Sequence, residues 1–275
     1  MYSKLESKSV SIVIPMYNSE STIIRTLESV KNQTAFNLIS EIIIVNDGST
    51  DNSLDIVLKY SNENRGMNIK IINKANGGVS SARNVAMKEA KSEYIALLDS
   101  DDEWLSNKIE IQMRTFQMYP EIDFLGGDYN GKSLYILFKK IDKLYKATVK
   151  DLCIKFFPVT PSAIFKRKIV EEIGFFDEKQ EYAEDGNYFL KICAKYNYYH
   201  LPVQMVICGL GKQEFGVSGL SANLKEMYAG NVKNIKELKK DSIISNKFYL
   251  FLRIFYGIKY IRRIIITKMR SIFNK

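Results

Sequence analysis

The chain has 275 residues, of which 46% are hydrophobic, enough for one large domain with a full core. Its net charge of +9 comes from the end of the chain. The residues after Asp241 include eight basic and no acidic ones, so residues 1–241 contain 32 basic and 31 acidic residues. A body so close to neutral argues against a broadly basic nucleic-acid-binding protein. No uncharged apolar run reaches the roughly 18 residues of a membrane span, and we expect no signal peptide.

The three cysteines and the single histidine exclude further classes of site. Cys153, Cys193 and Cys208 show no CxxC spacing, which fits a reducing cytosol and predicts neither a zinc site nor a disulfide framework. His200 has no second histidine to form a triad or metal cluster, so we predict a structural role for it.

Short apolar segments alternate with helical segments over the first hundred residues. We predict strands at 10–14, 42–45, 69–72 and 94–98, and helices at 21–31, 51–62 and 79–90. Pro15 ends the first strand, Ser21 caps the first helix and Asp51 caps the second. This alternation predicts a parallel α/β sheet covered on both faces.

Polar turns follow all four predicted strands, at residues 15–18, 47–49, 76–78 and 99–101. Each turn alone is explained by ordinary turn chemistry. In parallel α/β sheets, however, ligands bind beyond the carboxyl ends of the strands. Together the four turns therefore predict one ligand-binding crevice.

Four acidic residues fall within the five positions from Asp99 to Glu103, directly after a buried strand. Crowded carboxylates that lose hydration need a compensating charge, and hard oxygen ligands suit Mg²⁺ or Mn²⁺. The alternative is a solvated acidic turn, with Asp102 near the N-cap of a helix that begins at Trp104.

Several ordered blocks strongly resemble family 2 glycosyltransferases of the GT-A fold, of the type that builds bacterial cell-surface polysaccharides. The blocks lie at 11–18, 44–51, 76–84 and 98–102, and the resemblance resumes at 160–165, 174–178 and 183–185. It implies an α/β, Rossmann-like fold, with a mostly parallel central sheet and helices on both faces. We predict a glycosyltransferase domain over 1–220, divided into a nucleotide-sugar half (1–104) and an acceptor half (105–220), and a helical C-terminal extension over 221–275.

The resemblance also implies a UDP-sugar donor and gives roles to the polar turns. Tyr17 would stack on the uracil base, Asp47 would accept a hydrogen bond from it, and Arg83 would approach the base or the phosphates. Asp99 would lie near the ribose and the cation, and Asp101 would be the more direct ligand of Mn²⁺ or Mg²⁺. The other predicted substrate-binding residues are Pro15, Glu20, Asn76, Ser100 and Glu184. Asp102 and Trp104 would shape and pack the turn.

The acceptor half supplies the predicted catalytic base, the group that deprotonates the acceptor. Residues 163–165 resemble the family's acceptor-side strand. A helix that begins near residue 182 is predicted to have a buried side formed by Tyr188, Phe189, Ile192 and Cys193. By resemblance, Asp185 deprotonates the acceptor hydroxyl. The alternative is that Glu184 and Asp185 are helix acids favoured by the dipole.

These features predict an inverting, metal-dependent transfer of one sugar to a hydroxyl of a saccharide. One base without a second carboxylate nucleophile suits a single displacement, and no Gln-x-x-Arg-Trp block of processive synthases follows Asp185. Residues 211–218 lack the histidine that some relatives use as a metal ligand, which leaves the coordination shell open. The alternatives are a sugar nucleotidyltransferase, although its Gly-rich loop is missing here, and a non-catalytic membrane-associated protein.

The tail from Ser242 has a helical pattern with an apolar stripe and a separate basic side. The stripe consists of Leu250, Ile254, Ile258, Ile261, Ile265 and Ile272, and the basic side of Lys259, Arg262, Arg263 and Arg270. Basic amphipathic helices bind anionic membranes, so we predict a cytoplasmic enzyme on the inner face of the plasma membrane, with a lipid-linked acceptor for lipopolysaccharide or capsule. The alternative is a helix packed on the catalytic domain.

Overall fold

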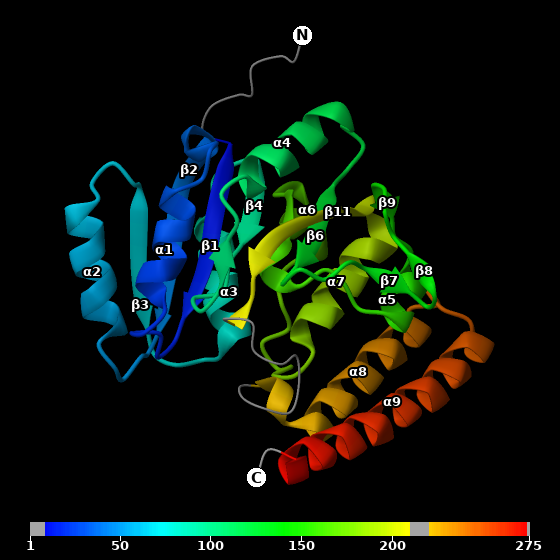
Figure 1. The fold of residues 1–275 in the computed structure, drawn as a ribbon. Coiled ribbons are helices and arrows are strands. Elements are labelled where there is room, and N and C mark those ends of the chain that lie inside the picture. The colour runs from blue at the N-terminus through cyan, green and yellow to red at the C-terminus, as the bar shows by residue number, and fades with distance from the viewer. Residues whose placement is uncertain (1–8, 210–219, 274–275) are drawn as a thin grey trace.

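The computed structural model describes residues 9–209 and 220–273, with side-chain surroundings given up to residue 270. The main sheet has the strand order β3-β2-β1-β4-β10-β6-β11-β5, and β9 pairs with β11 (Figure 1). Strands β1 to β4 are parallel to one another, β10 is antiparallel to both its neighbours, and β11 is parallel to β6. The predicted α/β class with a mostly parallel central sheet is confirmed.

The element bounds are as follows. The strands are β1 (Val10–Met16), β2 (Ile39–Asp47), β3 (Ile69–Lys74), β4 (Tyr94–Leu97), β5 (Glu103–Trp104), β6 (Phe124–Tyr129), β7 (Tyr135–Ile136), β8 (Lys139–Lys140), β9 (Tyr145–Lys146), β10 (Ile164–Lys166) and β11 (Tyr198–Ile207). The α-helices are α1 (Ile23–Lys31), α2 (Ser53–Glu63), α3 (Val79–Glu89), α4 (Lys108–Met118), α5 (Val149–Ile154), α6 (Lys168–Ile173), α7 (Glu184–Lys195), α8 (Leu224–Lys240) and α9 (Asn246–Phe273).

Several predicted boundaries are wrong in detail. Strand β1 continues through Pro15 to Met16, because its pairing with β4 has already ended at Val13 and the missing N–H removes no bond on that side. Thr22, not Ser21, precedes α1 as the N-cap, and its hydroxyl donates to the carbonyl of Ser100 instead of capping the helix.

The second helix and the acidic turn also differ from expectation. Asn52, not Asp51, is the N-cap of α2, although the Asp51 carboxylate still accepts from the N–H of Ser53 at 3.0 Å. Trp104 does not begin a helix: it lies in β5, which pairs with β11, and α4 begins only at Lys108. The alternative interpretation of Asp102 as a helix cap is therefore wrong.

The centre of the sheet is buried on both faces: every residue of β1 is buried, whereas the edge strand β3 has exposed positions at Lys70 and Asn73. Alternate side chains of β1 point to opposite faces: Ile12 and Ile14 join one hydrophobic cluster, and Val13 joins the other. Helices α1, α2 and α4 contribute to the first cluster, and α3 and α5 to α9 contribute to the second. His200 is buried in β11 and contacts Asp128 at 2.8 Å, as a structural residue does.

The predicted C-terminal extension is helical. Helices α8 and α9 lie as an antiparallel pair beside α7 (Figure 1), and Ile235 and Leu252 belong to the same buried cluster as Phe189 of α7. The pair shares a core with the rest of the chain, while the domain division at residue 220 stays a prediction. In the described part of the chain, no helix combines the length and apolarity that crossing a membrane requires.

Helix α9 begins at Asn246 rather than at Ser242, which lies in a turn with a positive φ of 57°. Its predicted apolar stripe faces away from the protein: each of these side chains is more than half exposed, namely Leu250, Ile254, Ile258, Ile261 and Ile265. Ile272 lies outside the residues whose side chains are described.

The predicted basic side of α9 faces the protein in part. Lys259 lies 3.4 Å from the carbonyl of Ile154, and burial, followed by the neighbouring Arg263, lowers the pKa of Lys259 to about 8. The exposed basic residues of α9 are Lys247, Arg253, Arg262 and Lys268.

Candidate active site

The four predicted polar turns lie together at the carboxyl ends of β1 to β4. The hydroxyls of Ser19, after β1, and Ser100, after β4, are 2.7 Å apart. The Glu20 carboxylate accepts from the backbone N–H and the side chain of Asn52 at 3.0 and 3.1 Å, and so joins the turn after β1 to the turn after β2. Hydrogen bonds therefore join the turns after β1, β2 and β4 to one another.

Asp47 is the centre of the turns after β2 and β3. Its buried carboxylate pairs with Lys74 at 2.5 Å and accepts from the N–H groups of Gly77 and Gly78 at 3.0 and 2.8 Å. Asn76 donates from its side chain to the Asp47 carbonyl at 2.9 Å. One carboxylate thus organises the glycine turn that leads into α3, with acceptor capacity remaining for a base N–H.

Pro15 and Tyr17, the two predicted substrate-binding residues at the end of β1, differ in their exposure to solvent. Tyr17 is 51% exposed, so its ring is open to a stacking partner, whereas Pro15 is buried within the strand. Tyr17 is therefore the better placed of the two for direct contact with a base.

Arg83 of α3 joins the two halves of the chain. Its guanidinium is 2.7 Å from Asp99 at the end of β4 and 3.0 Å from Glu184 at the start of α7. Burial opposes the charge of Arg83, but the two carboxylates outweigh it and raise its pKa. Arg83 therefore sets the spacing between the acidic turn and the start of α7.

The acidic turn concentrates negative charge. Asp101 is exposed, whereas Asp102 is buried and accepts from the N–H of Gly209 at 2.7 Å, which fits its predicted role in shaping the turn. Burial, followed by Asp99 and Asp101, raises the pKa of Asp102 to about 8. Trp104 packs beneath the turn, and its indole donates to the carbonyl of Pro161 at 2.7 Å.

These carboxylates fit a hard divalent cation. Within residues 9–209 and 220–273, no three His, Cys, Asp or Glu side chains are arranged as a metal-binding group. Mg²⁺ needs none, because it often takes one or two carboxylates together with substrate phosphates and water. Besides burial, Asp99 and Asp101 raise the pKa of Asp102, so a cation bound at this turn would relieve repulsion between neighbouring carboxylates. The predicted histidine-free segment 211–218 lies outside the described residues.

Asp185 lies in the first turn of α7. It is partly exposed and accepts from the N–H of Gly186 at 2.6 Å, whereas Glu184 is buried against Arg83. Burial, followed by Glu184, raises the pKa of Asp185 to about 7. A carboxylate that titrates near neutral pH is suited to general-base chemistry. The predicted buried side of α7 is confirmed for Tyr188, Phe189 and Ile192, and Cys193 is partly buried.

Sequence reasoning missed two residues of this site. Lys74 holds Asp47, and its position at the carboxyl end of β3 was the available signal. Ser19 joins the turns after β1 and β4 through Ser100, a contact that no spacing in the sequence reveals.

Comparison with known proteins identifies the family. A sequence model described as glycosyl transferase family 2 matches residues 11–174, which is more than half of the chain. The chain belongs to this family. Glycosyl transfer is therefore its enzyme class, and this class takes precedence over the nucleotidyltransferase and non-catalytic alternatives.

Similar proteins agree in fold and family. The UDP-Glc:alpha-D-GlcNAc-diphosphoundecaprenol beta-1,3-glucosyltransferase WfgD of Escherichia coli is 30% identical over 262 residues, which cover 92% of both chains. Among solved structures, S. aureus TarS in complex with UDP-GlcNAc has a TM-score of 0.66 and 24% identity, covering 82% of this chain and 66% of that one. The mannosyltransferase PcManGT of Pyrobaculum calidifontis, in complex with GDP-Man and Mn²⁺, has a TM-score of 0.68 and 17% identity, covering 90% and 68%. The GT-A fold is thereby confirmed.

Other curated relatives are much longer proteins. The chain spans only 11–15% of the length of three of them, which include synthases of chondroitin and hyaluronan from Pasteurella multocida.

Proposed function

We propose that this protein is an inverting, metal-dependent glycosyltransferase that moves one sugar from a UDP-sugar to a hydroxyl of a lipid-linked saccharide in surface polysaccharide synthesis. The arrangement that carries the proposal is the Arg83 bridge, which holds the Asp99 turn at one side of the site and the α7 start with Asp185 at the other. A donor on the strand ends and an acceptor beside Asp185 would then meet across this bridge.

The residues divide the work of a single displacement. Tyr17 and Asp47 hold the base, Asp99 lies on the ribose side, and Asp99 and Asp101 would hold the cation. A bound cation would act as a Lewis acid that stabilises the diphosphate as leaving group. Asp185 takes the proton of the acceptor hydroxyl as the hydroxyl oxygen attacks the anomeric carbon of the donor sugar. Glu184, the carboxylate next to Asp185 in the sequence, is paired with Arg83 and is therefore not available as a nucleophile, which favours inversion.

The choice of donor and acceptor rests on the relatives. WfgD covers nearly the same length, and its name gives UDP-Glc as donor and a diphosphoundecaprenol-linked sugar as acceptor. TarS, which shares the fold, binds UDP-GlcNAc. UDP-glucose and UDP-GlcNAc are therefore the first donors to test.

The test measures binding and product. We expect thermal stabilisation of the full chain by UDP in the presence of Mn²⁺, because a ligand of the folded state raises stability according to its affinity. We also expect UDP release from one of the two donors. Release of pyrophosphate from UTP and a sugar phosphate, without UDP-sugar turnover, would contradict the proposal and favour a nucleotidyltransferase.

We further infer that the exposed apolar face of α9 binds an anionic membrane. Each exposed Lys or Arg near such a surface contributes about 1 kcal/mol, so the four exposed basic residues of α9 supply about 4 kcal/mol. Each half-exposed Leu or Ile that enters the acyl boundary adds about 1–2 kcal/mol. With five such side chains, apolar insertion is the larger contribution, and added salt weakens binding without abolishing it.

Vesicle sedimentation tests this inference. We expect the full chain to bind phosphatidylglycerol-containing vesicles at low salt, and the Ile258→Glu, Ile261→Glu double variant to lose binding while it retains its Tm and its UDP affinity. Leu58→Glu, at an exposed apolar position on α2, is the matched control and should bind as the unmodified chain does. Unchanged vesicle binding by the double variant would show that this face does not bind the membrane. A full chain that ignores the vesicles and forms a dimer, which the double variant loses, would show that a second copy covers this face instead.

A further inference from the structure

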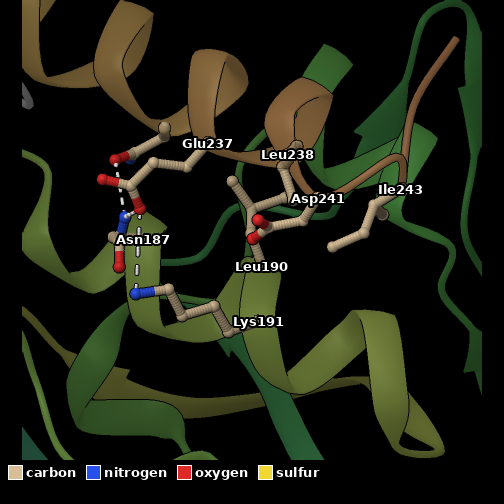
Figure 2. A pocket seen from close by; sticks show the side chains of 8 residues that line it. Asn187, Leu190, Lys191, Glu237, Leu238, Asp241 and Ile243 are labelled. Carbon is tan, nitrogen blue, oxygen red and sulfur yellow. Dashed lines mark hydrogen bonds and ion pairs between the residues drawn. The ribbon is translucent and has the colours of Figure 1, made fainter.

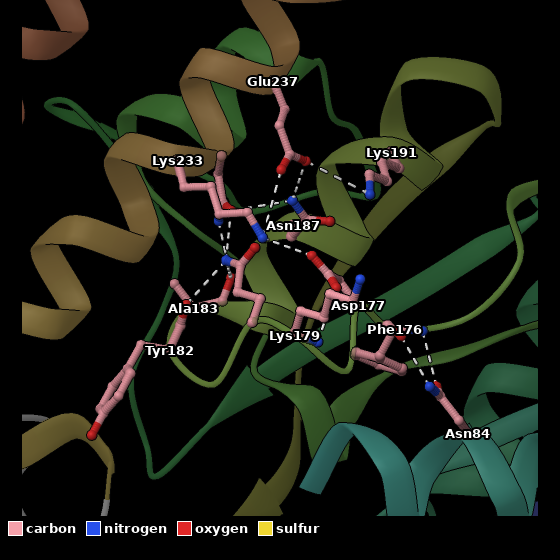
Figure 3. Close-up of polar contacts among 12 residues, drawn as sticks. Asn84, Phe176, Asp177, Lys179, Tyr182, Ala183, Asn187, Lys191, Lys233 and Glu237 are labelled. Atoms are coloured by element: carbon pink, nitrogen blue, oxygen red, sulfur yellow. Dashed lines mark hydrogen bonds and ion pairs between the residues drawn. The ribbon is translucent and has the colours of Figure 1, made fainter. Parts of the chain in front are cut away.

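Helix α8 contacts the segment that carries Asp185. The side-chain amide of Asn234 donates to the Ala183 carbonyl at 2.9 Å, and Gln180 donates to that carbonyl at 3.1 Å and to the Asn234 oxygen at 2.8 Å. Asn234 and Gln180 are only 3% and 5% exposed. Figure 3 shows Tyr182, Ala183 and α7 lying directly under α8. The backbone just before Asp185 is thus held by two buried amides, one of them from the C-terminal helix pair.

Ala183 needs such support because of its backbone conformation. Its φ of 56° and ψ of 32° place it in the left-handed region, which residues other than glycine rarely adopt. Conformations of this kind persist only where the surroundings over-determine them. Glu184 and Asp185 follow directly, so the direction in which α7 starts depends on this one strained residue.

Gly230 brings α8 close enough to provide this support. A Cβ at Gly230 would lie 2.2 Å from the carbonyl oxygen of Tyr182, a contact with rigid backbone. Gly230 precedes Asn234 by one helical turn, so the two residues face the same segment. The absence of a side chain at Gly230 lets the Asn234 amide reach the Ala183 carbonyl.

We propose that Asn234 is a positioning residue for the transfer reaction: by holding Ala183 in its left-handed conformation, it fixes the Asp185 carboxylate relative to the bound donor and acceptor. This inference rests on the role of Asp185 as base in the proposed function. It makes α8 a part of the active site, although its residues lie beyond the stretch that matches the family model.

One turn further along the same seam, a contact of the same kind offers a matched control. The Glu237 carboxylate accepts from Asn187 of α7 at 2.7 Å and pairs with Lys191 at 3.7 Å (Figure 2). This contact joins α8 to α7 and does not touch residues 182–185; Asn187 also donates to the Asn234 oxygen at 3.3 Å, but the bond from Asn234 to the Ala183 carbonyl does not involve Glu237. Glu237→Ala therefore removes helix packing of similar polarity without releasing Ala183.

The experiment compares Asn234→Ala, Gly230→Ala and Glu237→Ala in the full chain with Mn²⁺, using UDP release from UDP-glucose and UDP-GlcNAc with water as acceptor. We expect Asn234→Ala and Gly230→Ala to lower kcat about 10- to 100-fold, since a displacement of about 1 Å costs this much. Donor KM and UDP affinity should stay within about twofold, because the strand-end turns are untouched. Glu237→Ala should lower Tm to a similar degree and keep kcat.

Amide hydrogen exchange supplies a readout that does not depend on turnover. We expect peptides covering residues 182–187 to exchange faster in Asn234→Ala than in Glu237→Ala. Equal exchange in the two variants, or equal kcat values, would overturn the positioning role. Asp185→Asn in the same assay separates the two proposals: if it retains turnover, the base assignment itself fails, and if it is inactive while Asn234→Ala keeps full kcat, only the positioning role fails.

Discussion

Replacement of Arg83 by methionine tests the bridge between the two halves of the site. The Arg83 side chain is 5% exposed and Glu184 is 9% exposed, whereas Asp99 is 25% exposed and can regain water. Removing one partner of a buried ion pair costs about 3–5 kcal/mol, compared with about 0–1 kcal/mol for an exposed pair. In Arg83→Met, most of the lost free energy of unfolding should come from Glu184, which would stay buried without a counter-charge. Since 1 kcal/mol moves Tm by about 2–4 °C in a domain of 150–250 residues, we expect a decrease of about 6 °C or more.

Denaturant unfolding of Arg83→Met and of the double variant Arg83→Met, Glu184→Gln measures this effect. The double variant should recover most of the lost free energy of unfolding, because it carries no uncompensated buried charge. The loss in the single variant should shrink as pH falls, since protonation neutralises the unpaired carboxylate. A loss below about 1 kcal/mol, or no recovery in the double variant, would refute the reasoning and show that water reaches Glu184.

Three further predictions concern single residues. Because Asp185 must be deprotonated to act as base and its pKa is about 7, kcat/KM for UDP release should rise with pH through this value. Asp185→Asn should lower turnover about 10²–10⁴-fold and spare UDP binding. A flat pH profile would contradict this role. Asp101→Ala should abolish the strengthening of UDP binding by Mn²⁺ in calorimetry, and unchanged metal dependence would exclude Asp101 as a ligand. Gly48→Ala places a Cβ 2.8 Å from the N atom of Asn76 at a φ of +70°, so it should lose about 1–3 kcal/mol in denaturant unfolding, whereas Gly66→Ala, with open space around it, should change little.

The sequence by itself determined the fold class and the enzyme class, because these depend on patterns along the chain; the roles of the site residues stay predictions. Apolar runs alternating with helical segments predicted the parallel strands, and the polar turns after them lie together at the carboxyl ends of these strands. The ordered family blocks gave the enzyme class. Each strand, turn or block is recognised within about ten consecutive residues, and their order along the chain can be followed without knowing which distant segments meet.

Only the tertiary structure decided which residues support one another across the chain. Arg83 is separated by 101 positions from Glu184, and Asn234 by 51 positions from Ala183, so no spacing in the sequence reveals either contact. The helical pattern of the tail also did not show which side of α9 packs against the rest of the protein. Leu252 is buried against the rest of the protein, so the apolar stripe on the other side of α9 faces outward. Part of the basic side, including Lys259, faces the protein. An amphipathic pattern fixes the relative directions of the side chains, but the choice of the buried face depends on the surface that the rest of the fold presents.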